Sequence, residues 1–132
     1  FEQYLGQFPA QVFDKINENF IRCSFFELCS RYLSSYYTFA IEQNNSAGRS
    51  DFEMTGIPST DYYKDDRVVE FKYFKAKEAE HMLALNDPRP EDVAQVRAYA
   101  KDTKLKFPIY NVRSYIVYIC ANKGWKCWEV TE

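Results

Sequence analysis

Two apolar runs joined by a turn-rich segment, between Gly48 and Lys72, decide the fold predicted for this chain. The first reads Gly48-Arg49-Ser50-Asp51-Phe52-Glu53-Met54, and the second reads Val68-Val69-Glu70-Phe71-Lys72-Tyr73-Phe74. Residues i and i+2 of a strand lie on one face, so Glu70 and Lys72 are expected to share a face opposite Phe71. Charged groups on so apolar a strand are costly to bury unless they are paired or serve chemistry.

The composition predicts one compact domain. The chain has 132 residues, of which 46% are hydrophobic and 27% charged, which suits a globular core. A net charge of −2 argues against a purely electrostatic DNA binder but permits a local basic face. No stretch approaches the ~20 apolar residues of a membrane helix, so we expect no membrane partner and a cytoplasmic location. The chain begins with Phe1 rather than Met, so we expect it to be a piece of a longer protein.

The cysteines and the single histidine do not predict a zinc site. The four cysteines form no C-x-x-C pair, and His81 is alone. A two-residue loop at Lys123-Gly124 would place Cys120 opposite Cys127, where a cross-strand disulfide could form. Free thiols are nevertheless the expected state, because disulfides are rare in the cytosol.

The order of the elements predicts an α/β fold. A helix of roughly 19–34 precedes strands at 36–41, 49–57 and 67–74, and helices at 75–85 and 91–104 precede strands at 115–120 and 125–130. The three early strands have short links and favour an antiparallel meander. We therefore expect a mixed central sheet flanked by helices, with a C-terminal strand hairpin. Residues 1–18 are interpreted as an N-terminal extension left from a preceding domain, and residues 19–132 as the domain itself.

Acidic groups on the two apolar runs can converge with a lysine. If the strands pair, Asp51 of the first meets Glu70 and Lys72 of the second. Two carboxylates and water suit Mg²⁺, or Mn²⁺, better than zinc. A lysine beside them could hold an attacking water or counter the charge that develops on phosphorus. The E-x-K triplet alone is more often a cross-strand ion pair, so both interpretations stay open at this point.

Three motifs, in this order along the chain, resemble those of the PD-(D/E)-x-K nuclease superfamily, and its RecB-type branch looks most similar. The motifs are Gly48-Arg49-Ser50-Asp51, Val68-Val69-Glu70-Phe71-Lys72 and Gln95-Val96-Arg97-Ala98-Tyr99. The resemblance implies a restriction-endonuclease-like αβββαβ core over roughly residues 20–130. Ser50 stands where the superfamily name has proline, which removes no ligand.

The resemblance also implies roles for individual residues. Asp51 and Glu70 would be metal ligands, and Lys72 the catalytic lysine. Gln95 and Tyr99, four residues apart on one helix face, would point at the site or the nucleic acid; the alternative is a polar helix face with a half-buried tyrosine.

Two further acidic residues bear on that ligand set. Glu27 would match an extra ligand that some members carry on the first helix. Its alternative is a solvated helix-face glutamate paired with Arg31. Glu53, two residues past Asp51, could compete with Asp51 or support it, and is expected to be a solvated neighbour.

More narrowly, the chain looks like the nuclease-like domain at the C-terminus of certain bacterial AAA-ATPase-like proteins. The resemblance implies an attached ATPase domain as well as nucleic acid, DNA above all, as partners. Arg97, Lys101 and Lys104 form a basic stripe on the helix of Gln95 that can contact phosphates without reading bases. Its alternative is a solvated helix face.

Two functions from different classes follow. The first is a Mg²⁺-dependent nuclease that hydrolyses phosphodiester bonds in DNA. The second is a catalytically inactive module of the same fold, which binds nucleic acid or a partner and regulates the attached ATPase.

Overall fold

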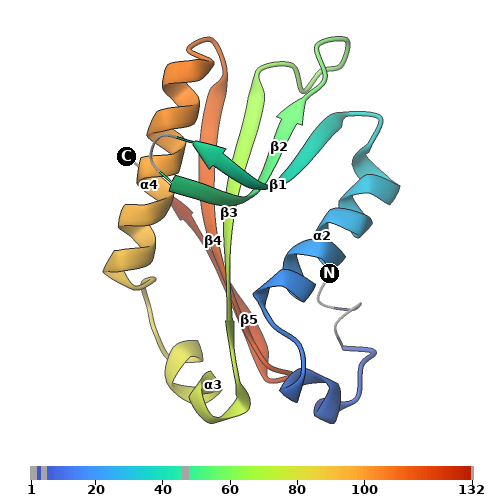
Figure 1. Ribbon diagram of the computed structural model, residues 1–132, viewed down its shortest axis with the longest axis vertical. Helices are drawn as coiled ribbons and strands as arrows, with labels where there is room; N and C mark the ends of the chain where they lie inside the picture. The colour runs from blue at the N-terminus through green and yellow to red at the C-terminus, as the bar shows by residue number, and fades with distance from the viewer. Residues whose placement is uncertain (1–2, 4–5, 46–47, 132) are drawn as a thin grey trace.

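The fold is a five-stranded sheet with helices on both faces (Figure 1). The computed structural model describes residues 3, 6–45 and 48–131. The side chains of Ala10, Asp14 and residues 42–45 and 48–51 lie outside this description. The elements in chain order are η1 (Ala10–Asp14), α2 (Glu18–Leu33), β1 (Tyr37–Asn45), β2 (Gly48–Gly56), β3 (Asp65–Phe74), α3 (Ala76–Leu83), α4 (Pro90–Lys106), β4 (Asn111–Cys120) and β5 (Gly124–Val130).

The sheet follows the chain, in the order β1-β2-β3-β4-β5. The first three strands are antiparallel, as the meander predicted, and β4 runs parallel to β3. A parallel pair needs a long crossover, and α3 with α4 supplies it. The predicted α/β architecture, a mixed sheet flanked by helices with a C-terminal hairpin, is confirmed.

Local signals explain where the two long helices begin. The side chain of Asn17 caps α2 by accepting a hydrogen bond from the backbone of Phe20 at 3.0 Å. Pro90 opens α4 and Glu91 and Asp92 lie in its first turn, where carboxylates suit the positive end of the helix. No described helix is long and apolar enough to cross a membrane.

The C-terminal hairpin differs from its predicted register. Cys120 pairs with Gly124, and the intervening turn contains three residues rather than two. Gly124 has a φ of 155°, a conformation that favours glycine. Cys127 lies opposite Val117, so Cys120 and Cys127 are on opposite faces of the sheet and the predicted juxtaposition is wrong. All four cysteines are free thiols.

Each face of the sheet has its own core. Phe52, Phe71 and Val69 pack under α2, whereas Val68, Ile116 and Tyr118 pack under α3 and α4. Phe13 of η1 also belongs to the core under α2, and its carbonyl accepts a hydrogen bond from the Tyr73 hydroxyl. The alternation along β3 therefore places Glu70 and Lys72, which share the parity of Val68, on the α4 face.

Candidate active site

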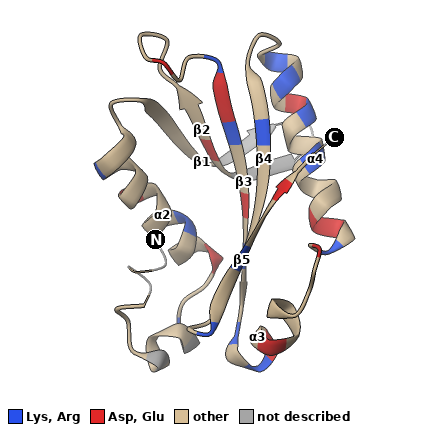
Figure 2. Ribbon diagram, turned by 180° about the vertical axis from the view of Figure 1, so that it is seen from behind, with Lys and Arg blue, Asp and Glu red and all other residues tan. Residues whose placement is uncertain are grey.

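Glu70 and Lys72 form a largely buried ion pair in the middle of β3. The distance from Lys72 Nζ to Glu70 Oε1 is 3.3 Å, and the two side chains are 20% and 2% exposed, respectively. Acidic and basic residues alternate along this strand (Figure 2). A carboxylate as buried as Glu70 is rare outside ion pairs, metal sites and catalytic sites.

Lys72 stays protonated. Burial lowers the pKa of its amine, but the charge of Glu70, and then that of Glu18, outweigh burial and raise the pKa overall. Glu18 lies in the first turn of α2 and accepts a hydrogen bond from the backbone of Tyr73 at 3.4 Å. Lys72 can therefore act as a fixed positive charge rather than as a base.

The backbone register brings Asp51 next to this pair. Phe52 of β2 pairs with Val69 of β3, and Glu53 pairs with Val68. Continuing this antiparallel register by one residue places position 51 opposite Glu70. The side chain of Asp51 lies outside the described residues, so its contacts stay a prediction.

A second pair of acids, Asp66 and Glu53, lies on the same face of the sheet. Asp66 precedes Glu70 by four residues on β3. Asp66 is 1% exposed, and no donor group reaches either of its oxygens within the described chain. Glu53, half-buried, is its diagonal neighbour across the β2–β3 pairing. Burial above all, and then the charge of Glu53 and a hydrogen bond to it, raise the pKa of Asp66 to about 8. Two carboxylates share a hydrogen bond only when one is protonated, and the raised pKa of Asp66 favours its protonated form near neutral pH.

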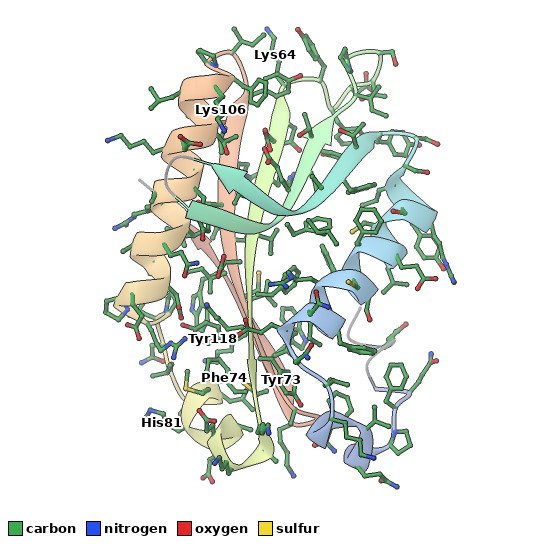
Figure 3. The ribbon with its side chains drawn as sticks, viewed as in Figure 1. Lys64, Tyr73, Phe74, His81, Lys106 and Tyr118 are labelled. Carbon is green, nitrogen blue, oxygen red and sulfur yellow. The ribbon has the colours of Figure 1, made fainter. Side chains whose placement is uncertain are left out.

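A buried polar network abuts Lys72 on its other side. Tyr118 is the register partner of Lys72 on β4, and its hydroxyl donates to Asp92 of α4. Arg89 donates to both Asp92 oxygens, at 2.9 and 3.3 Å, and its backbone N–H donates to the Tyr118 hydroxyl at 2.9 Å. The Phe74 ring packs on Tyr118 with centroids 5.0 Å apart (Figure 3). The Asp92 charge helps to raise the pKa of Lys72.

In the motif on α4, the side chains of Gln95 and Tyr99 contact each other. Gln95 Nε2 donates to the Tyr99 hydroxyl at 2.7 Å, which confirms that the two residues share a face of α4. Tyr99 is buried in the core with Val96 and Ile116. The geometry thus gives Tyr99 a packing role and leaves Gln95, which is half-buried, nearer the surface.

The basic stripe on α4 is exposed, and two of its members bind the chain itself. Arg97 donates to the carbonyl of Thr131 at 3.2 and 3.0 Å, and Lys104 donates to the carbonyl of Tyr110 at 2.6 Å. Lys101 is exposed between them. No carboxylate takes part in these contacts, so both groups keep their charge for an external anion.

Glu27 and Glu18 occupy different environments on α2. Glu27 is exposed and forms an ion pair with Arg31, in agreement with the solvated-face alternative. Its role as a metal ligand stays a prediction. Glu18 is the glutamate of this helix whose charge acts on Lys72.

Sequence reasoning did not identify Glu18, Asp66, Asp92 and Tyr118 as parts of the site. Asp92 was visible only as a favourable first-turn acid, and Tyr118 only as a strand residue. The sequence did offer one signal for Asp66: it lies four residues before Glu70, so the two side chains share a face of the strand. Within the described part of the chain, no three His, Cys, Asp or Glu side chains come together as a metal site. The Asp51 side chain lies outside the described residues.

The five-stranded mixed sheet flanked by helices is consistent with a restriction-endonuclease-like fold. Residues 16–129 match the family model of the PD-(D/E)XK nuclease superfamily, and the chain belongs to this superfamily. A comparison with curated proteins found no match, and a comparison with solved structures found none either.

Proposed function

We propose that this chain is a metal-dependent nuclease domain that hydrolyses phosphodiester bonds in DNA. One observation carries the proposal: the buried ion pair of Glu70 and Lys72 lies on β3 across from the register position of Asp51. Residues directly opposite each other in an antiparallel pair share a face, which supports joint action of Asp51 and Glu70.

The residues of this site fit a hard divalent cation. Asp51 and Glu70 would hold it through carboxylate oxygens, which Mg²⁺ and Mn²⁺ prefer. A bound ion would polarise the phosphodiester and lower the pKa of a water molecule. The protonated amine of Lys72 would stabilise negative charge that develops on the phosphoryl oxygens.

The network around Asp92 would position this lysine. Lys72 forms an ion pair with Glu70, and Tyr118, whose hydroxyl donates to Asp92, is its register partner. The charges of Glu70, Glu18 and Asp92, which lie on three different elements, all favour the protonated amine and restrict where it can lie. Positioning of this kind contributes to catalysis because the charge is already oriented before reaction.

A cleavage assay tests the proposal. The purified chain is incubated with linear DNA and Mg²⁺ or Mn²⁺, beside Lys72→Met and the exposed-lysine control Lys77→Met. Removing one charge-stabilising group costs about 10²–10³ in rate, so Lys72→Met should lose cleavage by that factor and Lys77→Met should not. Equal cleavage by all three proteins would identify a contaminating nuclease and contradict the proposal.

A metal titration tests the ligand set separately. Calorimetry with Mn²⁺ should show binding that Asp51→Asn abolishes, whereas Asp61→Asn, on an exposed loop, should bind normally. Metal binding without cleavage would favour the second function, an inactive module of the same fold.

The RecB-type branch, the association with an AAA-ATPase and a bacterial cytoplasmic setting belong to the same proposal. Their support is the Gln95–Tyr99 pair on α4 and the motif order. In this setting the attached ATPase would present nucleic acid to the domain or be regulated by it.

A further inference from the structure

A row of exposed aromatic rings runs along one end of the molecule. The row consists of Tyr36, Tyr62, Tyr63, Tyr110 and Phe107. Tyr36 and Tyr62 pack with centroids 5.3 Å apart, Tyr63 and Tyr110 lie 6.2 Å apart, and Tyr110 and Phe107 lie 5.8 Å apart. Four of these side chains are 43–48% exposed. Exposed aromatic groupings of this size mark binding surfaces.

The row is built on three connections that the backbone ties together. They are the α2–β1 turn, the β2–β3 loop and the α4–β4 connection, all at one end of the fold (Figure 1). The N–H of Ile57 donates to the carbonyl of Tyr36 at 2.8 Å, and that of Asn111 donates to Lys64 at 2.6 Å. The rings therefore stand on a fixed platform rather than on independent loops.

Two lysines place positive charge in the row. The amine of Lys64 lies 5.4 Å from the centre of the Tyr63 ring, and that of Lys104 binds the carbonyl of Tyr110. Neither amine has an acidic partner within the described chain. Asp65, the acid beside Lys64, is instead bound to Arg67 at 3.0 Å and to the Tyr37 hydroxyl. Figure 3 shows Lys64 at this end of the sheet, above the start of β3.

Exposed aromatic rings, with two ammonium groups that have no acidic partner among the described residues, match the chemistry of a single nucleic-acid strand. Unpaired bases stack on rings while phosphates meet the lysines, and base order matters little. Bases of a duplex already stack on each other and cannot reach such rings.

We propose that the row from Tyr36 to Phe107, with Lys64 and Lys104, is a stacking platform for single-stranded nucleic acid. The inference rests on the proposed nuclease function because it names the form of nucleic acid that the domain takes. It selects single-stranded or frayed ends over intact duplex.

Binding measured without turnover tests this inference. Fluorescence anisotropy in EDTA compares a labelled single strand of about 15 nucleotides with a blunt duplex of the same sequence. Tyr63→Ala should raise the single-strand Kd by about fivefold or more. Tyr63→Phe keeps the ring and should bind as wild type. Tyr32→Ala is the matched control, because Tyr32 is 74% exposed on α2 outside the row.

Charge variants sharpen the same test. Lys64→Gln should reduce the slope of log Kd against log salt by about 0.7, the value for one phosphate contact with a single strand. Asp61→Asn removes a negative charge, which would repel the phosphates, from the same loop and should strengthen binding. Thermal melting should show all these exposed variants folded.

Several outcomes would overturn the inference. Duplex bound as tightly as single strand, or equal binding by wild type and Tyr63→Ala, contradicts it. So does a dimer that Tyr63→Ala dissociates in sedimentation while strand binding is unchanged, since the row would then be a protein interface. If the chain cleaves DNA but does not bind the single strand through this row, the platform alone is refuted. If it binds the single strand through this row but does not cleave DNA, the nuclease function alone is refuted.

Discussion

The two faces of the sheet differ in the kind of side chain that they bury. The face under α2 is filled by rings: Phe25 packs 4.9 Å from Phe52 and 5.1 Å from Phe71, centre to centre. The face under α4 contains most of the buried polar side chains. These are Asp66, Glu70, Asp92, Asp102, Thr103 and Ser114. Both faces belong to the same strands, so the alternation of side chains separates a stabilising surface from a chemical one.

The difference shows where burial of charge is tolerated. On the α4 face each described buried acid has a specific compensation: Lys72 for Glu70, Arg89 for Asp92, Lys106 for Asp102 and a proton for Asp66. Buried charge without such partners would be strongly destabilising. Variants on the α2 face should therefore change stability, whereas variants on the α4 face should also change charge balance and chemistry.

The largest effect on stability is expected on the α2 face. Phe52 is completely buried among rings, so Phe52→Ala should lower the free energy of unfolding by about 3–5 kcal/mol. Urea denaturation followed by circular dichroism measures this. Phe107→Ala, which removes a half-exposed ring, is the control and should change stability by no more than ~0.5 kcal/mol. Equal losses for the two variants would contradict the division between core and exposed rings.

The next effect depends on pH and comes from Asp66. The pKa of Asp66 is raised from 3.8 to about 8 in the folded chain, so above pH 4 the unfolded state releases a proton that the folded state keeps. Stability should therefore fall as pH rises from about 4 to about 8 and level off above it. Asp66→Asn stays neutral at every pH and should therefore remove most of this fall.

Unfolding by urea at pH 5, 7 and 9 measures the Asp66 effect. The difference between wild type and Asp66→Asn isolates this group from all others that titrate. Parallel pH profiles for the two proteins would show that Asp66 is ionised in the fold.

A smaller effect is expected from the network beside Lys72. Tyr118→Phe removes the hydroxyl that donates to Asp92 but leaves the Arg89–Asp92 pair. A hydrogen bond to a charged group is worth about 1.5–3 kcal/mol, so we expect a loss of about 2 kcal/mol. If the network also positions Lys72, kcat should fall while KM stays near its wild-type value. An unchanged kcat would restrict Tyr118 to a structural role.

The smallest effect is expected at the exposed pair on α2. Glu27→Gln breaks the ion pair with Arg31, and exposed i,i+4 pairs contribute about 0.3–0.5 kcal/mol. Cleavage should be unchanged if Glu27 is solvated. A large drop in cleavage with intact folding would instead support its predicted role as a metal ligand.

The predictions from sequence were strongest where the chain is locally consistent. The strand pattern around Glu70 and the turn signals predicted the meander and placed Glu70 and Lys72 on one face, and the structure confirms both. The predicted register of the C-terminal hairpin was wrong because the turn begins earlier and is one residue longer than expected: residues 121–123 form it, and Cys127 lies opposite Val117 instead of Cys120, a shift of three residues. A shift of one residue reverses the face of every side chain.

The sequence by itself determined the class of fold, the order of elements and the face that carries Glu70 and Lys72, because periodicity and turn chemistry are local properties. Only the tertiary structure decided that Asp66 is buried as a protonated acid and that Tyr118 and Asp92 abut Lys72. Only it gathered Tyr36, Tyr63 and Phe107 at one end of the sheet. Burial and proximity between residues far apart in the chain depend on how the elements pack, which no local pattern records.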